Sequence, residues 1–305
     1  MIFIPVRINT LRPGHAVNFD VFIKIGERYI HYIRKTDPFD GDRIKSLKTK
    51  GVSKLYIPRE GEVDYLKYLD EGLGELKNVK IDIRERSLFA QDSLITAAEN
   101  AQASIASTET YRQSEQRILS VAEFLYGEKN ALHEMLSSGV AKDIYEHSSH
   151  VSTLALKLAS KVGITAEKDL KPLGMAALLH DIGKEGSGLD PLLPREKLDP
   201  EQLKVYRGHP ERAVTMIQDK AHIGGEVVEM ILNHEEIGAG VGFPGKKHLA
   251  RLSLSQQVLN LCNEYDRMCN VNGTSPLEAI KQFRFDKIGL FDLKLIDQLA
   301  AILKV

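Results

Sequence analysis

The pattern of apolar and polar positions divides the chain into a β-type beginning and a helical remainder. At the start, short runs rich in Ile, Val, Tyr and Phe are separated by turn sequences, as in MIFIPVRI, VNFDVFIKIG, RYIHYIRK and KLYIP. Such runs predict strands, with a hairpin around Gly26 and Glu27. The Asp40–Gly41 step predicts a cap followed by a short helix. Residues 1–75 are therefore predicted to form a small α+β, β-rich domain.

A long polar segment follows this predicted domain. Between Glu75 and Tyr126 the chain has neither glycine nor proline, and Ala, Gln, Ser and Glu dominate its middle. This composition predicts one or two long helices from about Arg84. The apolar stripe is thin, so the segment has two open interpretations, a solvated connector or a signalling or dimerisation helix. We treat residues 76–131 as a helical linker, which leaves a dimer through this helix open.

The remainder of the chain has helical periodicity throughout. Apolar residues recur three and four positions apart, as in Val151, Leu154 and Leu158. Loops that hold most of the remaining Gly and Pro separate these periodic stretches. The pattern predicts an all-α helical bundle over residues 132–305, so the chain is expected to have more than one domain.

Composition and charge exclude several classes of protein. Among the 305 residues, Lys+Arg is 41 and Asp+Glu is 42, which gives a net charge of −1. This balance argues against bulk electrostatic binding to nucleic acid or to an anionic membrane. No apolar run approaches the length of a membrane span, and the beginning lacks the pattern of a secretory signal. Two cysteines, Cys262 and Cys269, fit a reducing compartment, so we expect a cytoplasmic protein.

Histidine side chains, together with one aspartate, lie on the apolar faces of the predicted helices. His147, His180, His209 and His234 are on four separate inward faces, and Asp181 follows His180 directly. A lone histidine on such a face is usually a core residue, but several buried polar groups need partners. A shared metal satisfies them together, and imidazole with carboxylate suits Fe, Mn or Zn better than Ca or Mg. Asp181 has two oxygens and could bridge two ions.

These residues lie in motifs that resemble a known family. LLHDIGK, which ends at Lys184, is similar to the motif of HD-domain metal-dependent phosphohydrolases. HSSHV at His147 and GHPERA at His209 stand at fitting distances before and after it, and NHEEIGAGVGFPG resembles the longer motif of the HD-GYP subfamily. The resemblance covers about residues 132–305. It implies a bacterial signalling phosphodiesterase that hydrolyses cyclic di-GMP to pGpG or GMP with a metal-activated hydroxide.

The resemblance also implies roles for individual residues. The implied metal ligands are His147, His180, Asp181, His209, His234, Asn263 and Asp266. They imply two divalent metal ions, iron in the first place and manganese in the second. Asp181 and Lys184 are the implied catalytic residues, and Lys184 takes the place of the family's phosphate-contacting lysine. We expect Phe243, Lys246 and Arg251 to contact the substrate.

Several positions depart from the family pattern. Asn233 stands in place of a metal histidine, Asn263 in place of a metal aspartate and Glu236 in place of a basic residue. Phe243 keeps an aromatic ring but lacks the family's phenol hydroxyl. His150 stands where the family often has arginine; it could support the metal ligands from behind, but we expect a partly exposed histidine. Two alternatives therefore stay open: a weakened module that acts as a cyclic dinucleotide sensor or interaction hub, and a phosphohydrolase of another nucleotide.

The predicted N-terminal domain shows no motif with metal or nucleophile chemistry. We therefore expect residues 1–75 to regulate the helical domain or to bind a signalling protein partner.

Overall fold

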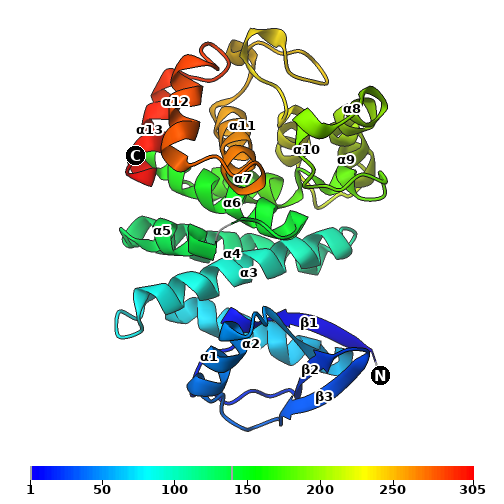
Figure 1. The fold of residues 1–305 in the computed structure, drawn as a ribbon, viewed down its shortest axis with the longest axis vertical. Helices are drawn as coiled ribbons and strands as arrows, with labels where there is room; N and C mark the ends of the chain where they lie inside the picture. The colour runs from blue at the N-terminus through cyan, green and yellow to red at the C-terminus, as the bar shows by residue number, and fades with distance from the viewer. Residues whose placement is uncertain (1, 139) are drawn as a thin grey trace. The chain divides into compact units, whose positions relative to one another are not determined.

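The computed structural model describes residues 2–138 and 140–305 of the chain. The chain divides into two compact units, Met1–Thr96 and Ala97–Val305, and Figure 1 shows their elements. The division predicted from the sequence, at residues 1–75, 76–131 and 132–305, stays a prediction.

The first unit is built on a four-stranded antiparallel sheet with the strand order β1-β4-β2-β3. The strands are β1 (Phe3–Arg7), β2 (Val21–Ile25), β3 (Arg28–Ile33) and β4 (Lys54–Pro58). β2 and β3 form the hairpin predicted around Gly26, which has a positive φ of 59° at the turn. The helices α1 (Gly41–Thr49) and α2 (Glu62–Gly74) complete the α+β arrangement, and the Asp40 side chain caps α1 as predicted.

The polar segment forms two long helices, α3 (Ile83–Ala103) and α4 (Thr108–Gly127). The Ser107 side chain accepts a hydrogen bond from the backbone N–H of Thr110 and so begins α4. α3 is buried at every position from 90 to 98, so the interpretation as a solvated connector is wrong for this helix. α4 packs against α6 (Ile144–Lys161) and α7 (Glu167–Leu179), which makes it part of the helical unit.

The second unit is helical, as predicted. α6 and α7 pack against each other, with α11 against α6 and α10 against α7 (Figure 1). The further helices of this unit are α5 (Ala131–Met135), α8 (Pro200–Arg207), α9 (His209–Ile217), α10 (Gly225–Asn233), α11 (Leu254–Asp266), α12 (Pro276–Phe285) and α13 (Leu293–Leu303). Leu154, Leu173 and Leu259 have no exposed surface and lie in the core between them. None of the helices in the described part of the chain has the length and apolar character of a membrane span.

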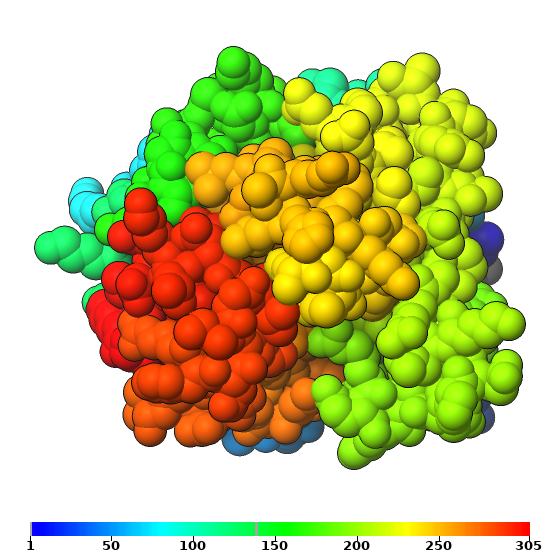
Figure 2. Space-filling model, turned by 90° about the horizontal axis from the view of Figure 1, so that it is seen from above, coloured from blue at the N-terminus to red at the C-terminus, as the bar shows by residue number. Residues whose placement is uncertain are grey.

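Figure 2 shows one face of the helical unit, formed by the later part of the chain. The yellow and orange segments around residues 230–260 lie there between the yellow-green segments that contain α8 and α9 and the red ones that contain α13. These segments include the end of α10 and the loop before α11.

Candidate metal centre

The polar residues identified from the sequence lie at the ends of four helices. His147 lies in the first turns of α6, and His180 and Asp181 follow the last residue of α7. His209 begins α9, and His234 directly follows α10. All five side chains are at most 1% exposed. Residues spread over almost ninety positions thus meet inside the helical unit, as the inward-facing pattern predicts.

Asp181 lies between two pairs of imidazoles. Its Oδ2 is 3.5 Å from Nε2 of His147 and 3.4 Å from Nε2 of His180. Its Oδ1 is 3.1 Å from Nε2 of His209 and 3.6 Å from Nε2 of His234. The five residues thus form two groups that could each hold a metal ion, and both groups share Asp181. One carboxylate oxygen faces each pair, which is the position of a ligand that bridges two ions.

Each of the four imidazoles uses its Nδ1 for a hydrogen bond away from the centre. For three of them the acceptor is a backbone carbonyl oxygen at 2.6–2.8 Å: His180 donates to Ala177, His209 to Tyr206 and His234 to Ile231. His147 donates to Oδ2 of Asp266 at 2.6 Å. A carbonyl or carboxylate oxygen can only accept, so Nδ1 carries the proton. Nε2 is left with its lone pair toward Asp181, which is the tautomer that metal-ligating histidines adopt.

The donor set fits a divalent metal. The Nε2 atoms of His209 and His234 are 2.8 Å apart, and those of His147 and His180 are 3.3 Å apart. Lone pairs at these separations repel unless a cation lies between them. Burial lowers the pKa of His209 to about 4 and also lowers the pKa of His147, so both imidazoles are neutral near pH 7. Neutral imidazoles with a carboxylate suit Fe, Mn or Zn.

Lys184 contacts the centre from the short 3₁₀ helix η5 (Ile182–Lys184). Its Nζ donates to Oδ2 of Asp181 at 2.6 Å and lies 5.2 Å from the ring centroid of Tyr206. Burial opposes ionisation of Asp181, but the adjacent Lys184 holds the pKa of this carboxyl well below its ordinary value. Burial also lowers the pKa of Lys184, and the Asp181 carboxylate opposes that shift, so the two side chains form a buried ion pair beside the imidazoles.

Gly183 has a packing role that the sequence does not reveal. A Cβ at this position would lie 2.0 Å from the carbonyl oxygen of His209 and 2.6 Å from the backbone nitrogen of Ala213. The absence of a side chain lets α9 approach η5 closely. The motif glycine thus lets His209 lie near His180.

Asp266 lies behind His147 and not among the metal-facing atoms. Its Oδ2 accepts from Nδ1 of His147 at 2.6 Å, and its Oδ1 accepts from the Asn270 amide. Both oxygens of Asp266 thus orient other side chains in the described structure, and its expected role as a metal ligand stays a prediction. His150 is 1% exposed and its Nδ1 lies 3.5 Å from Oδ1 of Asp266, so the expectation of a partly exposed histidine is wrong.

Asn263 lies on α11 and stays a candidate sixth ligand. It is 2% exposed, and its Oδ1 accepts no hydrogen bond from the residues that the structure describes. A buried amide oxygen without a donor is a group that a metal or a bound water can satisfy. Asn233 is also buried, and its backbone carbonyl accepts a hydrogen bond from the Asn260 amide at 2.8 Å.

The expected substrate residues fall into two groups. The Phe243 ring lies next to the centre, with its centroid 6.2 Å from that of His209 and 5.9 Å from that of Tyr206. Lys246 and Arg251 are exposed, and in the described structure neither forms an ion pair or hydrogen bond with the centre. Their contact with a substrate stays a prediction.

Glu236 holds the loop that carries Phe243. Its carboxylate accepts from the backbone nitrogens of Gly245 and Lys247, the latter at 2.8 Å, and its side chain has no exposed surface. The departure from a basic residue at this position therefore has a structural reason, since a carboxylate is needed to bind these two donors.

A buried charged network beside the centre is not evident from the sequence. Oε1 of Glu235 accepts from the Tyr206 hydroxyl and from Arg267, the latter at 3.0 Å, and Oε2 accepts from Arg195 at 3.2 Å. Burial opposes ionisation of Glu235, but Arg195 and Arg267 hold its pKa well below the ordinary value. The sequence signal for this network is that Glu235 directly follows His234 and that Arg267 directly follows Asp266.

Two curated proteins are similar to the chain over part of its length. The cyclic di-GMP phosphodiesterase PA4108 of Pseudomonas aeruginosa is 31% identical over 144 residues, which are 45% of this chain and 34% of that protein. The cyclic di-GMP phosphodiesterase response regulator RpfG of Xanthomonas campestris pv. campestris is 22% identical over 230 residues, which are 74% of this chain and 55% of that protein. The chain thus spans about a third and about half of these two relatives.

A solved structure and a family model match larger shares of the chain. Bd1817, described as an HDG"Y"P protein from Bdellovibrio bacteriovorus, has a TM-score of 0.83 and 29% identity, with 100% of both chains covered. A family model described as HD domain matches residues 130–292, which include all five residues of the proposed centre. Because this match takes in more than half of the chain, the chain belongs to the HD domain family.

Proposed function

We propose that the chain is a metal-dependent phosphodiesterase that hydrolyses cyclic di-GMP to pGpG or GMP. The observation that carries this proposal is the position of Asp181, with one carboxylate oxygen toward each of two buried imidazole pairs. This arrangement supports two divalent metal ions, and we propose iron first and manganese second. Both curated relatives are named cyclic di-GMP phosphodiesterases, which supports the choice of substrate.

Each residue of the centre has a separate task in this proposal. Divalent metals bound here supply Lewis acidity and activate water for attack on phosphorus. Asp181 would be the ligand that both metal groups share, and the Nδ1 hydrogen bonds hold the four imidazoles in place. Lys184 places a positive charge where negative charge develops on the phosphoryl oxygens. Burial strengthens these interactions because it excludes bulk water.

A catalytically weakened module that senses a cyclic dinucleotide, or serves as an interaction hub, is the second candidate. Phe243 beside the centre carries no hydroxyl, and the Glu236 carboxylate is used to hold the loop. The residues expected near the substrate therefore offer fewer hydrogen-bond donors than the family pattern does, although most of the metal-facing residues are kept. A phosphohydrolase of another nucleotide is the third candidate, since the same centre could act on a different phosphate ester.

The decisive experiment uses the full chain, purified anaerobically and loaded with Fe(II) or Mn(II). It is incubated with cyclic di-GMP, and the products are separated by chromatography beside a panel of other cyclic and linear nucleotides. We expect pGpG and then GMP from the loaded protein, and neither from an Asp181→Ala control. Binding of cyclic di-GMP without turnover would favour the sensor, and preferred cleavage of another nucleotide would favour the third candidate. Absence of both binding and cleavage would contradict the proposal.

We infer further that the first unit regulates the helical unit or binds a signalling protein partner, and that the chain acts in the cytoplasm. The candidate metal-binding groups found among the described residues all lie in the helical unit, which supports a non-catalytic role for the first. A dimer through the long helices stays a proposal that the mass of the purified protein in solution would test.

A further inference from the structure

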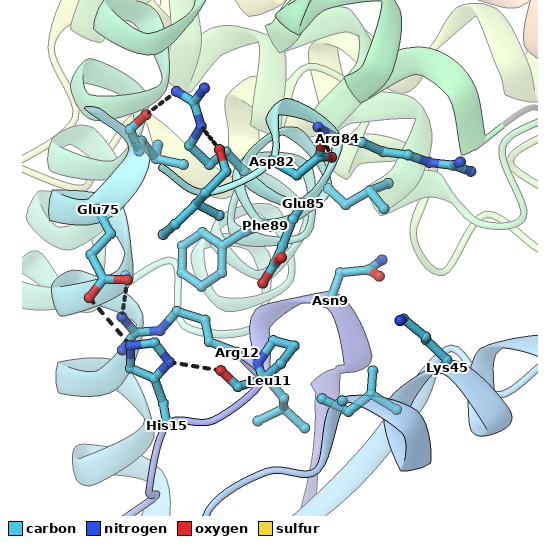
Figure 3. A pocket seen from close by; sticks show the side chains of 18 of the residues that line it. Asn9, Leu11, Arg12, His15, Lys45, Glu75, Asp82, Arg84, Glu85 and Phe89 are labelled. Atoms are coloured by element: carbon cyan, nitrogen blue, oxygen red, sulfur yellow. Dashed lines mark hydrogen bonds and ion pairs between the residues drawn. The ribbon is translucent and has the colours of Figure 1, made fainter. Parts of the chain in front are cut away.

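The first unit contains a partly open cavity of about 240 Å³ (Figure 3). It is bounded by residues 9–15 after β1, by α1, by the end of α2 with η3 (Glu75–Lys77), and by the start of α3. All of these segments belong to the first unit. Ligand pockets for drug-sized molecules begin at roughly 300 Å³, so this cavity suits a smaller molecule with a single ring or a short chain.

The floor of the cavity is apolar and rigidly packed. Leu11, Ile44, Leu76 and Phe89 line it and are at most 4% exposed. A Cβ at Gly72 would lie 2.2 Å from Cζ of Phe89, so the glycine allows the ring to pack directly against α2. Such a floor favours the apolar body of a ligand over a fully hydrated ion.

Arg12 lines the cavity and has a hydrogen-bond donor without a partner among the described residues. Its side chain is 8% exposed, NH1 lies 2.9 Å from Glu75, and the guanidinium lies 4.4 Å from the ring centroid of Tyr68. Nε is buried and has no hydrogen-bond partner among the described residues. Figure 3 shows Arg12 near Phe89, with its guanidinium toward Glu75 and His15. A buried N–H without an acceptor is costly, and a ligand oxygen could satisfy it.

The charges around the cavity favour an anion. The basic residues of the lining, histidine aside, are Arg12, Lys45, Lys48, Arg84 and Arg86, and the acidic ones are Glu75, Asp82 and Glu85. Oδ1 of Asp82 accepts a hydrogen bond from the backbone N–H of Arg84 at 2.9 Å, so this carboxylate already has one partner. Lys45 and Lys48 are exposed at the rim on one face of α1. Their positive potential attracts a small anion toward the opening.

We propose that this cavity is a binding site for a small carboxylate with an apolar ring or short chain. The apolar body rests on Leu11, Ile44 and Phe89, and a carboxylate oxygen accepts the Nε–H of Arg12. Lys45 and Lys48 stabilise the negative charge from the rim. The site lies outside the proposed metal centre, and it gives the first unit a ligand of its own.

The chain has no tryptophan, which permits a fluorescence test with a single reporter. Leu88 lines the cavity and is half-buried, so Leu88→Trp places the reporter at its edge. Three probes share one ring and differ in charge: benzoate, benzamide and benzylamine. We expect benzoate to change the emission saturably and to bind about tenfold more tightly than benzamide, with benzylamine weakest, because a charged acceptor strengthens the hydrogen bond to Arg12. Ligand-observed NMR on the unmodified chain repeats the comparison without the reporter.

Two sets of variants locate the site. Lys45→Gln combined with Lys48→Gln should weaken benzoate binding several-fold at low salt, whereas Lys50→Gln, an exposed lysine at the end of the same helix outside the cavity, should not. Arg12→Gln should weaken it about tenfold, with folding checked by thermal unfolding. The proposal is overturned if benzoate and benzamide bind alike, if no probe binds in either assay, or if Lys50→Gln has the effect of the double variant.

Discussion

Oδ2 of Asp266 on α11 lies 2.6 Å from Nδ1 of His147 on α6. Both side chains are buried, with exposures of at most 1%, so the hydrogen bond is shielded from water. It fixes the tautomer and the orientation of His147 and increases the electron density at Nε2, the nitrogen that faces Asp181. If His147 binds a metal, we expect Asp266 to support it from behind.

The first prediction concerns this support. Asp266→Ala should lower metal affinity by roughly 10–100-fold without abolishing it, because His147 stays in place but loses its fixed orientation. Metal titration of apoprotein, followed by elemental analysis after dialysis, measures the change. Asp266→Asn is the matched control, because its amide oxygen still accepts the Nδ1–H and should keep more of the affinity. Complete loss of both metals in Asp266→Ala, with the fold intact, would instead make Asp266 a direct ligand.

The second prediction concerns Asp181. Its two oxygens face different imidazole pairs, so Asp181→Ala should lose more metal than the replacement of any single histidine, such as His180→Ala. Two ions per chain in the native protein and fewer than one in Asp181→Ala are the expected contents. A native content of one ion that Asp181→Ala leaves unchanged would refute a shared ligand. Circular dichroism of each variant excludes a general loss of helices.

The third prediction separates charge from ligation at Lys184. Its ammonium cannot bind a metal and lies 2.6 Å from Oδ2 of Asp181. Lys184→Ala should leave metal content unchanged or higher, because a positive charge near the ions is removed. Turnover, or cyclic di-GMP affinity if turnover is absent, should fall. Lys204→Ala, an exposed lysine on α8, is the control and should behave like the native protein. If Lys184→Ala changes neither rate nor ligand affinity, Lys184 does not contact the phosphate.

Helical periodicity in the sequence places His147 and His234 on inward helix faces. His147 precedes Val151 by four positions and His234 follows Ile231 by three, so each shares a face with that apolar residue. The hairpin at Gly26 and the cap at Asp40 likewise depend on local turn chemistry, and the structure has both. These features are predictable because they involve neighbouring positions.

Features that depend on distant segments could not be predicted in the same way. Asp266 and His150 meet only because α11 packs against α6, and a sequence pattern does not distinguish a ligand from a group behind it. The packing role of Gly183 depends on the backbone of α9. The burial of α3 was not evident from the sequence either. Its buried positions include small and polar residues such as Ser87 and Gln91, and they do not form a wide apolar stripe.

The fourth prediction concerns pH and Asp92 on α3. Burial raises the pKa of Asp92 to about 6, although the charge of Arg7 and the N–H of Asn9 oppose the shift. The unfolded value is about 4, so the protonated form is favoured in the folded state. The stability that Asp92 contributes is thus fully present below about pH 4 and is lost as pH rises through about 6.

Asp92→Asn removes this titration and keeps an oxygen for the Asn9 N–H. The unfolding free energy of the variant relative to the native protein should therefore rise with pH, by roughly 2 kcal/mol between pH 4 and 7. Urea unfolding at several pH values measures the difference. A difference that is constant over this range would show that Asp92 titrates normally.

The last prediction concerns Phe243, whose ring centroid lies 6.2 Å from that of His209. Phe243→Tyr adds a hydroxyl that can donate one hydrogen bond to a substrate, worth roughly 0.5–1.5 kcal/mol. This corresponds to about a tenfold change at most, so the substitution alone should not turn an inactive protein into an efficient one. The Glu236 carboxylate still holds the loop in this variant, and Asn233 and Asn263 are unchanged, so the other departures from the family persist. Rates of pGpG formation at saturating metal, compared between the native chain and Phe243→Tyr, measure the effect. A thousandfold gain would show that the missing hydroxyl by itself limits catalysis and that the remaining departures do not.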